Sequence, residues 1–191
     1  MSLDSSAVLS MFRHSGALLD GHFKLSSGLH STGYLQCALV LQHPPQAEAL
    51  GRALGDVLRH LDATVVLSPA MGGLIIGHEV GRALGVRAIF SERQEGQMTL
   101  RRGFTLGATD RVVVIEDVVT TGLSTRETIA VVSAAGATIV GAGAIVDRSA
   151  GTADLGVPFQ ALVQLDVPTY QSDACPLCAA GQAVTKPGSR T

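Results

Sequence analysis

RVVVIEDVVTTGLST, residues 111 to 125, combines an apolar strand pattern, two acids and the start of a helical pattern. Residues 111 to 115, with a core of three valines and an isoleucine, are typical of a buried strand. Glu116 and Asp117 follow at once, and a loop of small and hydroxyl-bearing residues leads into the helix. Free amides at a helix start bind phosphate, and carboxylates accept hydrogen bonds from sugar hydroxyls. The order of these features indicates a site for a phosphorylated sugar.

A competing interpretation of this segment is an ordinary strand–loop–helix connection with a capped helix. A Walker P-loop is excluded, because no Gly-Lys-Ser or Gly-Lys-Thr triplet occurs anywhere in the chain.

Apolar runs and helical patterns alternate on both sides of the central segment. This alternation predicts an α/β fold, a central parallel sheet flanked by helices, with ligands gathered at the carboxyl ends of the strands. We expect further strands at residues 64–67, 86–90, 138–146 and 160–165. We expect helices at about residues 45–60, after the loop at 68–73 up to about residue 84, and at about 123–135.

The length of 191 residues predicts a single domain. We expect residues 41–166 to form its core, residues 1–40 to build a small hood over the sheet, and residues 167–191 to form a C-terminal tail. Within the flanks we expect one helix or a broken pair of helices over residues 5–19 and a strand at 22–25. An apolar run resumes over 34–41, and we expect a loosely ordered segment at 185–191.

The composition excludes several classes of protein. The net charge of −2 gives no indication of a nucleic-acid or membrane-surface binder, and no apolar run approaches the ~18 residues that span a bilayer. The N-terminal residues do not resemble a signal peptide, and three cysteines suit a reducing compartment. We therefore expect a cytoplasmic protein without nucleic-acid or membrane partners.

Three other segments carry chemistry that the central segment could use. Residues 68–73 form a second loop of small residues between a strand and a helix, which is either an anion site or a plain turn. Residues 91–103 are polar and predict a mobile hairpin, in which Arg93 lies just past a strand end. Arg148 follows the strand that ends near residue 146, where it can bind a carboxylate or pair with Asp147.

The central segment resembles the 5-phosphoribosyl-1-pyrophosphate (PRPP) motif of type I phosphoribosyltransferases. The resemblance implies that fold, with a hood and a flexible lid hairpin, and Mg²⁺ as cofactor. It also implies that Glu116 and Asp117 act in catalysis and hold the ribose, and that Arg93 of the lid stabilises the departing pyrophosphate. The residues implied to bind PRPP are Glu116, Asp117, Val118, Val119, Thr120, Thr121, Gly122, Leu123 and Ser124, with Ala70, Met71 and Gly72 in the second loop.

A motif near the N-terminus narrows the resemblance. GHFKLSSGLHS, residues 21 to 31, is similar to the opening motif of orotate phosphoribosyltransferases. This implies transfer of a phosphoribosyl group from PRPP to orotate in pyrimidine synthesis, with Thr120 and Arg148 binding orotate, and a homodimer. A purine phosphoribosyltransferase and a non-catalytic PRPP or nucleotide sensor remain as alternatives.

The chain departs from the family pattern at a few positions. Leu123 stands where many members have a second glycine, which is tolerable if Leu123 opens the helix with a negative φ. Ser26 and Gly72 stand where lysines are usual, and the lid lacks the usual group of lysines and histidines.

Cys175-Pro176-Leu177-Cys178 resembles a zinc knuckle, but two cysteines supply only half of a tetrahedral site. Cys37, a histidine or a second subunit could complete it; two free thiols in a turn are the alternative. Each of the six scattered histidines is expected to be a surface or packing residue rather than a ligand.

Overall fold

The computed structural model of the chain describes residues 3–25 and 27–187. It contains a six-stranded sheet and a separate three-stranded sheet. In the larger sheet the strand order is β5-β4-β3-β6-β7-β8, and every neighbouring pair is parallel except β4 with β5. The expected parallel α/β core is confirmed. Its strands are β3 (Val65–Pro69), β4 (Arg87–Gln94), β5 (Gln97–Leu100), β6 (Arg111–Val119), β7 (Thr138–Asp147) and β8 (Phe159–Gln164).

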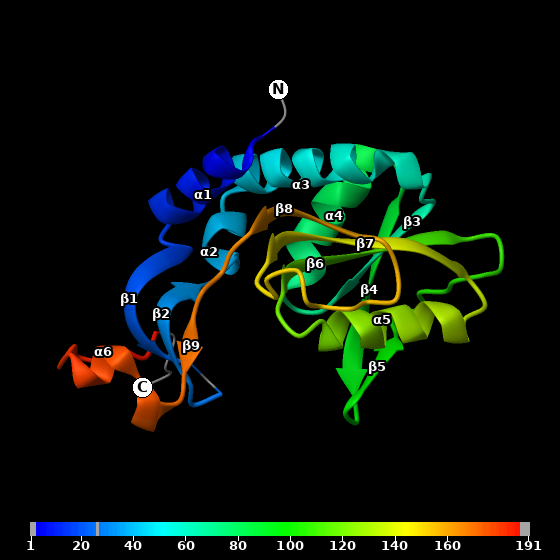
Figure 1. Cartoon of the computed structure of the whole chain (residues 1–191). Coiled ribbons are helices and arrows are strands. Elements are labelled where there is room, and N and C mark those ends of the chain that lie inside the picture. Colours follow the sequence, from blue (N-terminus) through cyan, green and yellow to red (C-terminus); the bar gives the residue numbers. More distant parts are fainter. Residues whose placement is uncertain (1–2, 26, 188–191) are drawn as a thin grey trace.

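Helices cover both faces of this sheet (Figure 1). Helix α5 (Leu123–Ala134) lies on one face, and α3 (Pro44–Leu58) and α4 (Gly73–Leu84) lie together on the other. Side chains of β6 alternate between two apolar clusters: Val113 and Ile115 face the first, and Val112 and Val114 face the second. Both faces of β6 are therefore buried, and this explains why residues 112–115 are all apolar.

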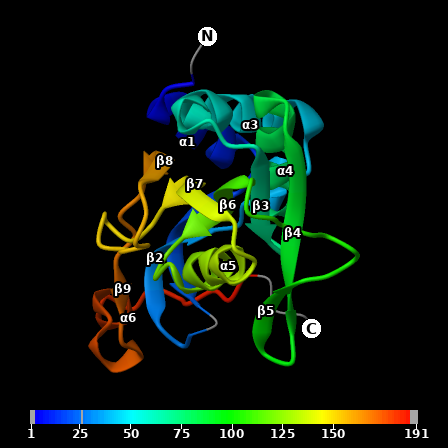
Figure 2. The ribbon, with the colours of Figure 1, turned by 90° about the vertical axis from the view of Figure 1, so that its right-hand side faces the viewer.

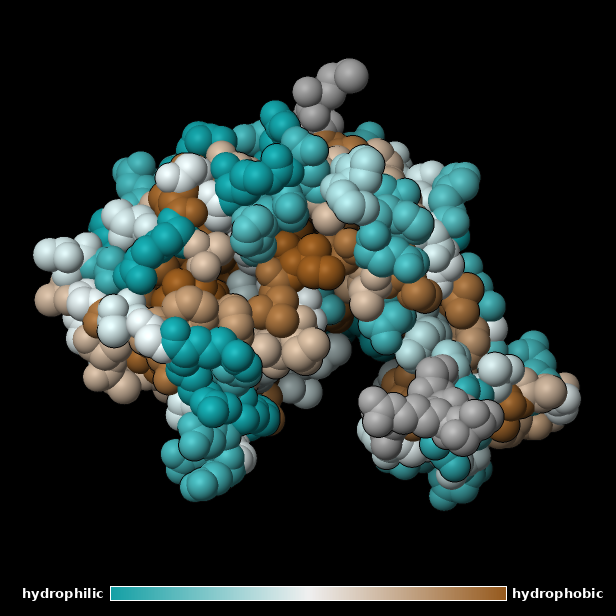
Figure 3. Space-filling model, turned by 180° about the vertical axis from the view of Figure 1, so that it is seen from behind, coloured by the Kyte–Doolittle hydropathy of each residue, from teal (hydrophilic) through white to brown (hydrophobic). Residues whose placement is uncertain are grey.

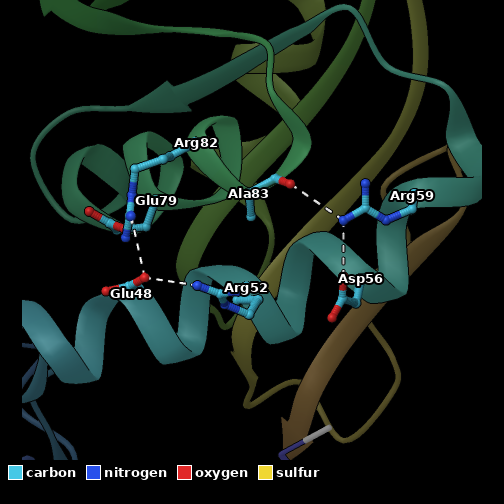
Figure 4. Close-up of a pocket in the computed structure, with 7 residues that line it drawn as sticks. All are labelled: Glu48, Arg52, Asp56, Arg59, Glu79, Arg82 and Ala83. Carbon is cyan, nitrogen blue, oxygen red and sulfur yellow. Dashed lines mark hydrogen bonds and ion pairs between the residues drawn. The ribbon is translucent and has the colours of Figure 1, made fainter. Parts of the chain in front are cut away.

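Helices α3 and α4 are packed very closely. A Cβ added at Gly51 would lie 2.3 Å from the Cβ of Glu79, so this position of α3 needs a glycine. Along the solvent side of the pair, Glu48 accepts from Arg52 at 2.9 Å and from Arg82 at 3.4 Å (Figure 4). These exposed ion pairs line a surface pocket that contains none of the predicted site residues.

The three-stranded sheet forms the hood. Strands β1 (Leu18–Lys24) and β2 (His30–Leu35) are antiparallel, and β9 (Thr169–Tyr170) pairs with β2. The hood therefore combines the N-terminal strands with a strand from the C-terminal tail, on one side of the core (Figure 1).

Strands β4 and β5 form the predicted hairpin, which turns at Glu95 and Gly96 and extends beyond α5 (Figure 2). Seen from behind, the hood and the hairpin project as two arms with a hollow between them (Figure 3). The remaining helical elements are α1 (Ser5–His14), α2 (Ala38–Leu41), α6 (Pro176–Ala179) and the short 3₁₀ turns η1 (Arg59–Leu61) and η2 (Ser172–Ala174).

The structure differs from the expectations for the flanks at three places. Helix α1 ends at His14 instead of residue 19, because Leu18 and Leu19 belong to β1. The apolar run over 34–41 is divided between the end of β2 and helix α2. Thr185, expected in a loose segment, accepts from the Lys24 amide and donates to the His22 carbonyl, both at 2.8 Å. Ser26 and residues 188–191 lie outside the described residues.

None of the helices in the described part of the chain combines the length and the apolar character that a bilayer span requires.

Candidate active site

The two acids of the central segment lie within strand β6, which continues to Val119 instead of ending at residue 115. The strand is longer than predicted because β7 pairs with it over this length, with Glu116 opposite Ala144 and Val119 opposite Asp147. Glu116 is buried, and its Oε2 accepts a hydrogen bond from Ser124 Oγ at 2.8 Å. The hydrogen bond connects the acid pair to the first turn of α5.

The loop after β6 presents its residues at the mouth of helix α5. Gly122 takes φ of +74°, and Leu123 is the first helical residue. Leu123 does not have a positive φ, which confirms the expectation that it can open the helix. The Leu123 amide donates to Thr121 Oγ1 at 3.4 Å, and the Gly122 position supplies no side-chain cap, so the next amides of the first turn can bind a ligand.

The second loop lies against the acid pair. Gly72 is close enough to Asp117 that an added Cβ would be 2.6 Å from its Oδ1. The peptide between Ala70 and Met71 is cis, the Ala70 amide donates to the Ser91 carbonyl at 2.8 Å, and Met71 is 80% exposed. Residues 70–72 therefore share the same edge of the sheet as Glu116 and Asp117, as parallel neighbours β3 and β6 require.

Burial makes both carboxyl groups harder to ionise. The pKa of Glu116 is raised to about 8, first because the group is removed from water and second because Asp117 is its neighbour. The pKa of Asp117 is also raised, chiefly by burial, although the Val118 amide donates to it at 2.8 Å and favours its charged form. Hydrogen-bond donors or a cation brought by a ligand would lower both pKa values, because they favour the charged carboxylates.

A cleft of about 1010 Å³ separates the hood from the carboxyl ends of the strands. Arg148 lines it and is half-buried, and burial lowers the pKa of its guanidinium. Its Nε is buried without a hydrogen-bond partner among the described residues. Asp147, the alternative partner, accepts from the Ser149 amide and hydroxyl at 2.8 and 2.6 Å. Arg148 therefore lines the cleft with a guanidinium whose Nε lacks a partner among the described residues, which suits a carboxylate ligand.

The loop after β6 also lines a second cavity. Thr120 and Thr121 line the cleft beside Arg148 and also a cavity of about 250 Å³ that includes Arg93. Arg93 forms an ion pair with Glu127 of α5 and donates to the Gly96 carbonyl at 2.8 Å. The loop thus forms a wall shared by two adjoining cavities. The second one is lined by Arg93, Val118, Val119, Thr120, Thr121, Gly122, Leu123, Ser124 and Thr125.

Arg102 has a structural role in the hairpin. Its guanidinium donates to both oxygens of Glu92, at 2.8 and 2.9 Å, and lies over the ring of Phe90. These contacts join the two arms of the hairpin, whereas Arg93 faces the loop.

Several cleft residues were not among the predicted site residues. Lys24 lies in the opening motif and Tyr34 lies three residues after it, so their sequence positions alone could have suggested them. Lys186 belongs to the C-terminal tail. Most other residues that line the cleft are more than 30 positions away in the sequence, so no local sequence pattern could have predicted its place there. Cys175 and Cys178 lie away from the cleft lining, beside two histidines of the hood.

The buried acid generates a test of stability against pH. In the folded state Glu116 keeps its proton up to about pH 8, whereas in the unfolded chain it loses it near its ordinary pKa of 4.5. Unfolding therefore releases a proton between these values, and the free energy of unfolding should fall as pH rises, by at most about 1.4 kcal/mol per pH unit for this group.

In Glu116→Gln this fall should be reduced, and the variant should be more stable than the wild type at pH 8, as measured by urea unfolding between pH 5 and 8.5. The amide oxygen of the substituted side chain can still accept from Ser124. Glu95→Gln, in the exposed hairpin turn, is the matched control and should keep the wild-type slope. Equal slopes in wild type and Glu116→Gln would contradict the assignment.

Comparisons with known proteins agree with this geometry. The sequence model of the phosphoribosyl transferase domain family matches residues 38–159 of the chain. The orotate phosphoribosyltransferase of Heliobacterium modesticaldum is 53% identical over 191 residues, covering 99% of this chain and 100% of that protein. The crystal structure of orotate phosphoribosyltransferase from Aeropyrum pernix has a TM-score of 0.69 and 27% identity, covering 83% of this chain and 93% of that one.

A Mycobacterium tuberculosis orotate phosphoribosyltransferase, solved in complex with PRPP, shares the fold with a TM-score of 0.70 at 23% identity, covering 85% of this chain and 97% of that one. The domain match spans more than half of the chain, and the Heliobacterium relative aligns along nearly all of it. The chain belongs to the orotate phosphoribosyltransferase family.

Proposed function

We propose that the protein transfers the 5-phosphoribosyl group of PRPP to N1 of orotate, giving orotidine 5′-monophosphate and pyrophosphate for pyrimidine synthesis. The observation that carries this proposal is the loop of Thr120 and Thr121, which borders both the Arg148 cleft and the cavity at the mouth of α5. A phosphate at the helix mouth and a carboxylate at Arg148 would be held on either side of one short loop.

The proposed reaction breaks the bond between C1 of the ribose and the pyrophosphate oxygen and forms a bond from C1 to N1 of orotate. Pyrophosphate leaves with the electron pair of the C1–O bond. Orotate N1 bonds through the electron pair of its N–H bond, and the N1 proton passes to the leaving pyrophosphate or to water. The main contributions of the chain are then positioning and charge stabilisation.

Each part of the site has a role in this scheme. The amides and hydroxyls of residues 120–124 hold the 5′-phosphate, and the carboxyl groups of Glu116 and Asp117 accept from the ribose hydroxyls. Residues 70–72 lie beside Asp117, where their amides can approach the pyrophosphate. Arg148 and Thr120 bind orotate, and Arg93 approaches the donor from the hairpin.

Mg²⁺ is the cofactor that we propose. It prefers oxygen ligands and commonly binds through one or two carboxylates together with substrate phosphates. The adjacent Glu116 and Asp117 fit this chemistry, and among the described residues no group of three such ligands converges there, as suits an ion that arrives with the diphosphate. When bound, the ion would neutralise charge on the leaving pyrophosphate.

Product formation with orotate, adenine, hypoxanthine, guanine and xanthine in parallel, each with PRPP and with or without Mg²⁺, tests the proposal. We expect orotate to be the only one of the five bases that is converted, and its conversion to require Mg²⁺. Turnover of a purine without orotate would identify a purine enzyme, and PRPP binding without release of pyrophosphate with any base would identify a sensor.

Arg148→Ala should raise the KM for orotate by roughly 10- to 100-fold, since a hydrogen-bonded charged group contributes about 1.5–3 kcal/mol. The KM for PRPP should change by less than about threefold. Arg52→Ala, an exposed arginine in the ion pairs of α3, is the control and should leave both values unchanged. Equal losses for orotate and PRPP would refute the assigned role.

Arg93→Ala should lower kcat by roughly 100-fold with little change in either KM, because a cation that acts on the leaving group stabilises mainly the transition state. Arg102→Ala removes a neighbouring cation that pairs within the hairpin and should have a much smaller effect on kcat. An unchanged kcat with a raised KM for PRPP would make Arg93 a ground-state phosphate ligand.

We also propose a homodimer, in line with the family resemblance. Met71 and Ile75 support it, because these two apolar side chains, one just before α4 and one in its first turn, are 80% and 44% exposed. Sedimentation equilibrium should give about twice the mass of one chain; a monomer at micromolar concentration would contradict the proposal. A cytoplasmic location agrees with three unpaired cysteines and can be checked by cell fractionation.

A further inference from the structure

Two histidines of the hood and two cysteines of the tail converge at one point. His22 lies on β1, His30 lies on the paired strand β2, and both are 5% exposed. Cys175 is 3% exposed and precedes α6, which carries Cys178. Within the described part of the chain, this is the one group of three or more histidines, cysteines and acids whose ligand atoms converge, and all four atoms lie within 4.8 Å of one another.

Three of the four separations below are those of a tetrahedral metal site, and the two histidine nitrogens lie closer, at hydrogen-bond distance. His22 Nε2 lies 2.9 Å from His30 Nδ1 and 3.5 Å from Cys175 Sγ. Cys178 Sγ lies 3.8 Å from His22 Nε2 and 3.3 Å from His30 Nδ1. In a tetrahedral zinc site with Zn–S of about 2.3 Å and Zn–N of about 2.0–2.1 Å, neighbouring ligand atoms are roughly 3.3–3.8 Å apart.

We propose that one zinc ion binds between the hood and the tail, coordinated by two imidazoles and two thiolates: those of His22, His30, Cys175 and Cys178. Two sulfur and two nitrogen ligands in a tetrahedron favour zinc over magnesium, calcium and manganese, which prefer oxygen. Since the protein supplies all four ligands, no position is open for substrate, and the site is structural.

The surroundings of His22 support this assignment. His22 Nδ1 lies 2.9 Å from the Gln182 carbonyl oxygen, which can only accept. His22 therefore donates through Nδ1, and Nε2, the atom that faces the cysteines, is left with its lone pair for a metal. Such a hydrogen bond from the far nitrogen to a carbonyl is the usual support of a metal-ligating histidine.

The position of the site explains what the ion would stabilise. Strand β9 has only two residues, and small sheets of this kind have little stability of their own. The ligands join residues more than 140 positions apart in the sequence. Beyond the cysteines the tail returns along β1, where Thr185 bonds to His22 and Lys24, and Lys186 then lines the cleft. Zinc would hold this segment against the hood.

The first test measures metal in the full chain, purified without a histidine tag and under reducing conditions. Mass spectrometry of the metals should find about one zinc per chain. After removal of zinc with a chelator, Co²⁺ should restore one equivalent of binding with the intense visible bands of tetrahedral cobalt and a thiolate charge-transfer band. A protein without zinc that gives no such cobalt spectrum, or a disulfide between Cys175 and Cys178, would overturn the proposal.

Variants locate the ion. Cys178→Ser, at the most exposed ligand, should bind less than a tenth of the wild-type zinc, whereas Cys37→Ala changes a buried cysteine outside the group and should retain all of it. The chelator should lower the melting temperature of the wild type and of Cys37→Ala, but not that of Cys178→Ser. Loss of zinc in both variants would refute the assignment. If Cys178→Ser fails to fold, the cobalt spectrum of the wild type decides alone.

Discussion

The arrangement of the site depends on two adjacent carboxyl groups that are buried in its central strand. Glu116 and Asp117 lie in β6 next to apolar neighbours, where the charged form of a carboxylate is expensive to maintain. Ser124 supplies one hydrogen bond to Glu116, and the Val118 amide supplies one to Asp117. Two neighbouring buried carboxyl groups reduce stability, and we infer that they are kept for the hydroxyl groups of a sugar, a common compromise at functional sites.

The rest of the core serves to hold this pair beside two loops. Parallel pairing of β3, β6 and β7 places the ends of three strands at one edge, and each end carries a functional segment: residues 70–72, the loop at 120–124, and Arg148. Because the loop at 120–124 is a wall of two cavities, the distance between them is fixed by a few residues of backbone. This rigid spacing is what a transfer between two bound molecules requires.

The core could be predicted from the sequence because its signals are local. The apolar run of β6, the glycine at 122 and the helix after it follow each other along the chain, so their order in space is their order in sequence. The length of β6 could not be predicted, since its pairing with β7 decides that two acids remain within a strand. Tertiary pairing here overrides the low strand propensity of Glu and Asp.

The hood and the tail were predicted less well for the same reason. Leu18 and Leu19 continue an apolar helical pattern, but they pair with Leu35 and Tyr34 in a sheet. His22 and His30 are eight residues apart and looked unrelated, because only the bulged pairing of β1 with β2 brings them to one side. Their cysteine neighbours come from the far end of the sequence.

The path of the tail gives the two halves of the site different times of completion during synthesis. The donor loop, the acid pair and helix α5 are all present once residue 134 has emerged from the ribosome. The cleft beside Arg148 is complete only after Thr169, Lys186 and Pro187 have been synthesised, because these residues line it. A nascent chain therefore acquires the parts to which we assign the sugar phosphate well before it completes the cleft to which we assign the base.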